Sequence, residues 1–231
     1  MIAMIVPAHN ESQHIARCLF SLHCAARCAD LAAEPVHIFV IADACTDDTA
    51  AAAQRWGATV LDCHVRNVGA ARALGAQAAL DAGARWLAFT DADTTVAQDW
   101  LAEQLAQGSD AVCGTVAVQS WSAWGRLAQA MQTHFATTYF DVDGHRHIHG
   151  ANLGVSADAY RKAGGFSALA SSEDVALVRA LEESGARIAW SAAPRVSTSA
   201  RQQFRAPDGF GATLLRVAQE HHGAALSGAL A

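Results

Sequence analysis

The first half of the chain alternates short apolar runs with segments of helical spacing, and this alternation constrains the fold more than any other feature. The apolar runs predict strands over residues 2–6, 36–42, 58–61, 86–90 and 111–114. The segments between them predict a helix that begins at a capping Asn10, and further helices over 50–56, 67–82 and 100–106. Strands that alternate with helices are typical of an α/β fold with a mainly parallel sheet and right-handed crossovers.

The pattern is less regular after residue 116. Residues 122–139 predict a mixed helix, 158–163 and 173–184 predict helices, 187–190 predict a strand, and 210–226 have helical spacing. A hydrophobic fraction of 52% is enough for a sizeable core, and the 231 residues contain no internal repeat. We therefore expect one domain, with a first half over 1–115, a second half over 116–205 and a C-terminal helix over 206–231. That helix is expected to pack on the core or to form a homodimer contact.

Charge and cysteine content argue against several classes of protein. The formal net charge of −6 argues against a nucleic-acid-binding protein, which needs a positive field to meet phosphates. The six cysteines contain no C-x-x-C pair, which favours reduced thiols in a cytosolic protein. The N-terminus has no basic stretch, and no apolar run approaches the roughly 20 residues of a membrane span. We expect a cytoplasmic protein without a signal peptide or a transmembrane segment.

Polar residues follow the ends of three predicted strands. Residues 7–11 follow the first strand, Asp43 follows the second, and Asp91 and Asp93 follow the fourth. These residues should meet at one edge of the sheet, because ligands of open parallel sheets bind outside the carboxyl ends of the strands. Two carboxylates one residue apart can share a divalent cation, and without a cation their charge would repel a diphosphate.

The stretch D-A-D-T-T at 91–95, taken alone, also fits a phosphatase of the haloacid-dehalogenase type. In that class an aspartate nucleophile, a second aspartate and a threonine follow a strand, with a lysine for the phosphate and a later acidic pair for Mg²⁺. Lys162 and the pair Glu173-Asp174 are the candidates for these roles. That class places its nucleophile on the first strand, however, and it leaves residues 6–11 and Asp43 without a role.

Six motifs in order resemble those of family-2 glycosyltransferases with the GT-A fold. They are V-P-A-H-N-E-S at 6–12, I-A-D-A-C-T-D-D-T at 41–49, R-N-V-G-A-A-R-A-L-G at 66–75, D-A-D at 91–93, the segment 150–166, and S-E-D at 172–174. A lone D-x-D is a weak signal, but six ordered motifs across residues 2–201 are a strong one. The resemblance implies a Rossmann-like three-layer sandwich with a mainly parallel mixed central sheet. Its first half would bind a nucleotide sugar, and its second half would bind the acceptor and carry the catalytic base.

For the donor, the resemblance implies a nucleotide-diphosphate sugar, with a UDP-sugar favoured. The implied donor-binding residues are Pro7, Ala8, Glu11, Asp43, Arg72, Asp91 and Asp93. Asp43 would accept a hydrogen bond from a nucleobase N–H, and Arg72 would help to hold the base or the phosphates. Asp93, with Asp91 beside it near the ribose, would hold Mn²⁺ or Mg²⁺ on the diphosphate, where the cation stabilises the leaving group.

For the acceptor, the resemblance makes Asp174 the general base that takes the proton of an attacking hydroxyl, and a single displacement would invert the anomeric centre. The implied acceptor-side residues are His147, His149, Gly150, Asn152 and Glu173. His145, His147 and His149 alternate, so they face one way in an extended segment. They form a polar loop at the acceptor pocket, a solvated loop, or a zinc site without an evident fourth ligand. The acceptor would be a sugar, a small molecule or a lipid-linked hydroxyl.

One departure from the family pattern affects the metal site. Many relatives have a histidine that binds metal or phosphate in the region after residue 150, but here no histidine occurs between 150 and 220. A third protein ligand for the metal is therefore in doubt. Arg201 and Arg205 are either substitutes that approach the diphosphate or plain surface cations. A catalytically silent sugar-nucleotide-binding module is the remaining alternative, and the intact acidic positions argue against it.

Overall fold

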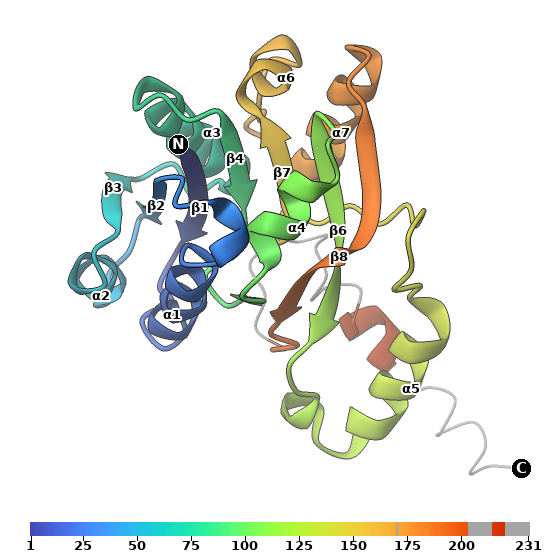
Figure 1. Ribbon diagram of the computed structural model, residues 1–231. Coiled ribbons are helices and arrows are strands. Elements are labelled where there is room, and N and C mark those ends of the chain that lie inside the picture. The colour runs from blue at the N-terminus through green and yellow to red at the C-terminus, as the bar shows by residue number, and fades with distance from the viewer. Residues whose placement is uncertain (170, 203–213, 220–231) are drawn as a thin grey trace, which may run out of the picture.

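The computed structural model describes residues 1–169, 171–202 and 214–219, and it has a curled eight-stranded sheet with helices on both faces (Figure 1). The strands are β1 (Ile2–Ala8), β2 (Val36–Asp43), β3 (Thr59–Cys63), β4 (Trp86–Phe89), β5 (Thr95–Val96), β6 (Ala111–Val118), β7 (Leu153–Ser156) and β8 (Ile188–Thr198). Their order in the sheet is β3-β2-β1-β4-β7-β6-β8-β5.

Parallel pairing dominates the N-terminal part of this sheet. β1 pairs in parallel with both β2 and β4, β2 pairs in parallel with β3, and β6 pairs in parallel with β8. β7 is antiparallel to β4 and β6, and β5 is antiparallel to β8. The expected mainly parallel mixed sheet is therefore confirmed.

The two faces of β1 show why the sheet needs helices on both sides. Ile2, Met4 and Val6 point into one hydrophobic cluster, whereas Ala3 and Ile5 point into another. The first cluster is completed by α1 (Ile15–Ala25), α2 (Thr49–Arg55) and α4 (Trp100–Ala106), and the second by α3 (Val68–Asp81), α6 (Ala157–Lys162) and α7 (Glu173–Glu183). Because both faces are buried, the strand reads as a continuous apolar run, and the molecule has three layers.

The small side chains of α3 let this helix lie close to the sheet. Gly75 faces β1 and β2, and a Cβ at this position would lie 2.4 Å from Ile41 Cδ1 and 2.7 Å from Ile5 Cγ2. Contacts this short are not possible for a real Cβ, so the glycine is required by packing rather than by its turn-forming ability. Close packing of α3 brings its N-terminus, with Asn67 as the cap, next to the end of β2.

One predicted helix boundary was wrong. The helix expected from Asn10 begins at Ile15, because Asn10 has a φ of 52° in the left-handed region and its side-chain oxygen accepts from the Thr46 N–H instead. The mixed helix expected over 122–139 agrees in its bounds with a 3₁₀ segment η2 (Ser122–Leu127) followed by α5 (Ala128–Thr138), and η2 has non-helical geometry at Gly125. A further 3₁₀ turn, η1 (Ala29–Leu31), precedes β2.

A third, smaller apolar cluster lies away from the two main ones. Trp124 of η2 and Met131 of α5 pack against Ala200, just after β8, and against Leu214 and Val217. Residues 214–219 are helical, and the remainder of the helix expected over 210–226 lies outside the described residues. Within the part of the chain that the structure describes, no helix is long and apolar enough to cross a membrane.

Candidate active site

The polar residues expected at the strand ends do meet at one edge of the sheet. β1, β2 and β4 are parallel neighbours, so Glu11, Asp43 and Asp91 follow strand ends that lie side by side. The chain runs outward to β2 and β3 on one side of β1 and returns to β4 on the other side. Such a reversal of strand order is where open α/β sheets bind their ligands.

Asp43 fixes the loop that leads into α3. One carboxylate oxygen accepts the Arg66 N–H at 2.8 Å, and the other accepts the Asn67 N–H at 2.9 Å. Arg66 has a φ of 49°, and this left-handed turn directs both N–H groups at the carboxylate. Each oxygen retains a second lone pair, so Asp43 can accept one more hydrogen bond.

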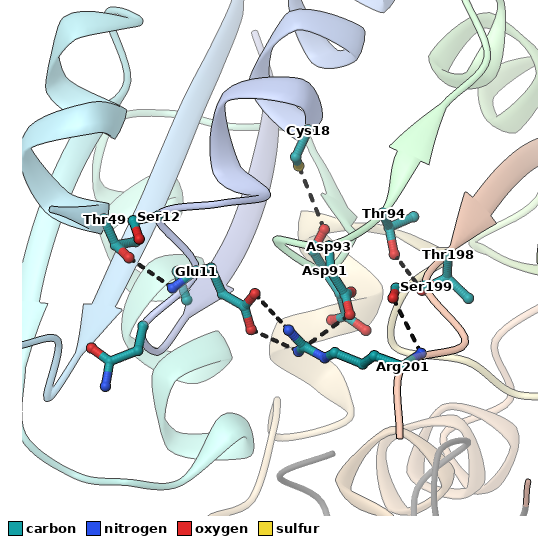
Figure 2. Close-up of polar contacts among 12 residues, drawn as sticks. Glu11, Ser12, Cys18, Thr49, Asp91, Asp93, Thr94, Thr198, Ser199 and Arg201 are labelled. Atoms are coloured by element: carbon teal, nitrogen blue, oxygen red, sulfur yellow. Dashed lines mark hydrogen bonds and ion pairs between the residues drawn. The ribbon is translucent and has the colours of Figure 1, made fainter. Parts of the chain in front are cut away.

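Two carboxylates contact the guanidinium of Arg201 (Figure 2). Arg201 Nη1 and Nη2 bind the two oxygens of Glu11 at 2.8 and 2.7 Å, and Nη2 also lies 3.2 Å from Asp93 Oδ2. Glu11 is buried, and its backbone N–H donates to Thr49 Oγ1 at 2.7 Å. Arg201, which follows β8, thus connects Glu11, which follows β1, with Asp93, which follows β4.

Burial raises the pKa of Asp93 to about 6, and the nearby charges of Asp91 and Glu11 act in the same direction. The Arg201 guanidinium opposes this shift. A carboxylate with a raised pKa gains from any further cation placed against it, because the cation offsets both the lost hydration and the repulsion from its neighbours.

Arg72 connects this acidic pair to the start of α7. Its guanidinium is buried, donates to Asp91 Oδ1 at 2.6 Å, and forms an ion pair with Glu173. The guanidinium also lies over the ring of Phe166, with 5.6 Å between its central carbon and the ring centroid. Arg72 was expected to touch the donor, and its two carboxylate partners instead make it a link between Asp91 and Glu173.

Asp174 is held by two backbone N–H groups. Its Oδ2 accepts from Gly150 at 2.8 Å and its Oδ1 accepts from Val175 at 2.8 Å. Gly150 has no room for a side chain, because a Cβ there would lie 2.4 Å from the Arg72 guanidinium. Gly150 therefore lies between Arg72 and Asp174 and contacts both.

His149 is hydrogen-bonded to Tyr139. Tyr139 Oη accepts the Val116 N–H at 2.8 Å and lies 2.9 Å from His149 Nε2. In the neutral tautomer with its proton on Nδ1, His149 accepts the Tyr139 O–H through Nε2. Burial lowers the pKa of His149 to about 4, so the ring is neutral at pH 7.

Of the other two histidines of this segment, His147 stacks on Tyr139 and His145 stacks on His147. His147 lies over Tyr139 with ring centroids 4.1 Å apart, and His145 is buried with its Nε2 3.4 Å from the Ser191 carbonyl oxygen. Among residues 1–169, 171–202 and 214–219, no group of three or more His, Cys, Asp or Glu side chains is placed to hold a metal ion. The zinc alternative therefore has no support in this part of the chain.

Asn152 does not fit its expected acceptor-side role. It is buried, its Oδ1 accepts from Trp100 Nε1 at 2.8 Å, and its Nδ2 donates to the carbonyl oxygens of Thr115 at 2.7 Å and Pro194 at 2.8 Å. Both of its N–H donors are used, so it ties β6 to the segment around Pro194 and has no donor left for a ligand.

One residue of the site, Asp47, was not assigned a role from sequence. Asp47 accepts from the Ser12 N–H at 3.1 Å and from the Thr49 N–H at 3.0 Å, and these hydrogen bonds lower its pKa to about 2 despite an opposing desolvation. Its place in the I-A-D-A-C-T-D-D-T motif could have pointed to it. Pro7 and Ala8 lie at the end of β1, where they were expected.

The profile of glycosyl transferase family 2 matches residues 3–164 of the sequence. The chain belongs to this family. A comparison with curated proteins gives no match.

Solved structures agree with this family at the level of the fold. TarS 1-349 of S. aureus in complex with UDP-GlcNAc has a TM-score of 0.63 at 14% identity, over 94% of this chain and 65% of that one. The mannosyltransferase PcManGT of Pyrobaculum calidifontis in complex with GDP-Man and Mn²⁺ has a TM-score of 0.62 at 18% identity, over 87% and 57%. GalNAc-T7 with UDP, GalNAc and Mn²⁺ has a TM-score of 0.64 at 15% identity, over 87% and 44%. The chain thus spans less than two thirds of each, and the expected GT-A fold is confirmed.

Membership of family 2 removes the main support for the phosphatase alternative. Asp91 follows the fourth strand along the chain, β4, and not the first. Asp91 is also tied to Arg72, while Lys162 lies in the short helix α6. The D-A-D stretch is therefore explained by its place in the family-2 fold.

The acidic pair fits a divalent metal ion of the kind that this family implies. Asp91 and Asp93 supply carboxylate oxygens, and hard cations such as Mg²⁺ are bound by one or two carboxylates together with substrate phosphates. Asp93 already has a positive group, Arg201, against one of its oxygens. The donor set is thus suited to a cation that the diphosphate helps to hold.

Proposed function

We propose that this family-2 protein is a metal-dependent glycosyltransferase that moves a sugar from a nucleotide-diphosphate sugar to a hydroxyl acceptor with inversion. The observation behind the proposal is the connection from Asp93 and Asp91, through Arg72 and Glu173, to Asp174. It links a site suited to a diphosphate and a cation with a carboxylate suited to proton abstraction. The complexes of TarS with UDP-GlcNAc and of PcManGT with GDP-Man and Mn²⁺ support a nucleotide-sugar donor and a divalent cation.

The charges around the site support the need for a metal. Glu11, Asp91, Asp93, Glu173 and Asp174 are acidic, and only Arg72 and Arg201 are paired with them among the described residues. Among the described residues the acids outnumber the guanidinium groups, so this part of the site carries excess negative charge. A diphosphate would meet net repulsion unless a divalent cation bound with it. The cation would stabilise the charge on the departing nucleoside diphosphate.

Asp43 is the proposed contact to the nucleobase. Its carboxylate is held in place by two backbone N–H groups and can accept one more hydrogen bond, for which the imide N–H of uracil is suitable. Guanine also offers an N–H, so this contact alone does not choose between the two bases, and it is the resemblance to the family that favours a UDP-sugar. Pro7, Ala8 and Glu11 remain proposed as the other side of the pocket.

Asp174 is the proposed general base. The backbone N–H groups of Gly150 and Val175 fix the orientation of its carboxylate, so its remaining lone pairs can meet an acceptor hydroxyl. His149 lies near enough to Asp174 for the two to interact electrostatically. The proton on its Nδ1 makes it a proposed hydrogen-bond donor to the acceptor, with His147 beside it.

Thermal shift with nucleotides tests the donor site. In the presence of Mn²⁺, UDP at about a hundred times its Kd should raise the Tm by about 5 °C. Asp93→Ala should abolish the Mn²⁺ dependence of this shift, because the diphosphate loses its metal bridge. Asp81→Ala is the matched control, since Asp81 is an exposed acid that pairs with Gln77 at the C-terminal end of α3.

A Mn²⁺-dependent UDP shift that survives unchanged in Asp93→Ala would refute the ligand assignment. Release of inorganic phosphate from a generic phosphoester would favour the phosphatase instead. UDP binding without any turnover of UDP-sugars would favour a silent binding module.

A further inference from the structure

Arg201 is the one cation of the described residues that contacts both Glu11 and Asp93. It follows β8, so it enters the donor-side edge of the sheet from the second half of the molecule (Figures 1 and 2). Its side chain is 28% exposed, whereas that of Glu11 is 4% exposed. The guanidinium therefore covers the buried glutamate, and part of the Arg201 side chain remains exposed to solvent.

The hydrogen-bond inventory of Arg201 leaves donors for a ligand. A guanidinium has five N–H groups. Two of them bind Glu11 and a third faces Asp93. The other two, on Nε and Nη1, have no partner among the described residues. Phosphate oxygens are the ligands that such a planar fork of N–H groups binds best.

The backbone on the N-terminal side of Arg201 is fixed before any ligand arrives. The Ala200 carbonyl oxygen accepts the Trp124 indole N–H at 2.7 Å, and Ala200 itself is buried in the third apolar cluster. The Arg201 N–H donates to Ser199 Oγ at 3.3 Å. Because Glu11 also orients the guanidinium, little conformational entropy remains to be lost when a ligand binds.

We propose that Arg201 is a donor-binding residue that holds the diphosphate through the N–H groups left free by Glu11, beside the cation at Asp93. The inference rests on the proposed function, because it assumes that a nucleoside diphosphate binds at the strand ends. Glu11 is then the residue that orients Arg201, and Asp93 is shared between the guanidinium and the metal. This arrangement gives the diphosphate a protein cation in addition to the metal ion.

Calorimetric titration with two ligands separates a phosphate contact from a structural ion pair. UDP and uridine are each titrated into the full chain with Mn²⁺, for the wild type, Arg201→Gln, Arg201→Lys and the control Arg85→Gln. Arg85 makes a comparable two-point ion pair with Glu34, away from the site. Arg201→Gln should weaken UDP binding about tenfold to a hundredfold and leave uridine binding unchanged. Arg201→Lys should weaken UDP binding less than Arg201→Gln does, and Arg85→Gln should leave UDP affinity unchanged.

Two results would overturn the inference while the proposed function stands. One is unchanged UDP affinity in Arg201→Gln, and the other is an equal loss for UDP and uridine, which would mean that Arg201 only supports the pocket. If Arg201→Gln does not fold, Arg201→Lys decides by the same UDP-to-uridine comparison. If the wild type binds GDP rather than UDP, then GDP and guanosine replace the pair. A wild type that binds no nucleoside diphosphate would refute the proposed function itself, and this inference with it.

Discussion

At the scale of single residues, the site depends on buried charges whose partners come from distant parts of the chain. Arg72 is buried between Asp91 and Glu173, which lie on different elements, and Gly150 leaves it the space that it occupies. Breaking a buried ion pair by removing one partner is costly, because an uncompensated charge remains. Arg72 thus holds the side chains of Asp91 and Glu173 in place.

The pH dependence of stability should report on His149. Its pKa in the folded protein is lowered to about 4 from an ordinary value of 6.5, so between these values the unfolded chain binds a proton that the folded chain does not. Stability from this group is complete above about pH 7 and is lost as the pH falls, by about 2 kcal/mol between pH 7 and pH 5. Asp93 acts in the opposite direction, because its folded pKa is raised to about 6.

The contribution of His149 is therefore measured by comparing the wild type with the His149→Gln variant. Urea denaturation at pH 7 and pH 5 should show a larger loss for the wild type than for His149→Gln, whose amide oxygen can still accept from Tyr139. The Asp93 contribution is common to both and cancels. An equal loss in the two proteins would contradict the neutral state of the partly buried His149.

At the scale of elements, β8 is longer than its sequence pattern predicts, and it leads into the site. It is parallel to β6 along most of its length, pairs with β5 at its end, and leads directly to Ala200 and Arg201. The η2–α5 segment supports the residues after β8 through Trp124. The η2–α5 segment and Arg201 are thus connected through one short stretch of chain.

Trp124→Phe tests this connection. The phenyl ring keeps most of the apolar contact but removes the indole N–H, so the buried Ala200 carbonyl oxygen loses its partner. The free energy of unfolding should fall by about 1–3 kcal/mol in urea denaturation. Trp121→Phe is the control, because Trp121 packs against the same apolar cluster and against Phe135, but its indole makes no hydrogen bond to the described residues. Equal stability of Trp124→Phe and Trp121→Phe would contradict a supporting role for this hydrogen bond.

Local pattern was informative for some elements and not for others. The strands of the first half pair with their neighbours through βα units. Their apolar runs therefore predict their positions well, as for β1 and β4. β6 and β8 extend beyond their predicted ends because each is stabilised by the other across seventy or more residues. The start of α1 was wrong because Asn10 makes its hydrogen bond to the next βα loop rather than to its own helix.

At the scale of the whole molecule, the reversal of strand order places the donor-side acids where both halves of the chain can reach them. The sequence motifs identified the family and the acidic positions Asp91, Asp93 and Asp174. They did not predict the contact of Arg201 with Glu11, because the two residues are brought together only by the curl of the sheet. Asn152, in contrast, was assigned to the acceptor side from its motif, but its side chain is buried and bonded to backbone carbonyls.

Turnover of the donor tests the central claim most directly. UDP-sugars and GDP-Man are incubated with the full chain and Mn²⁺, and the released nucleoside diphosphate is measured by chromatography, with water as the default acceptor. The wild type should release UDP or GDP, and Asp174→Asn should release it at least about a hundredfold more slowly while keeping the Mn²⁺-dependent thermal shift with UDP. Equal release by the wild type and Asp174→Asn, or none by the wild type despite nucleotide binding, would contradict the account.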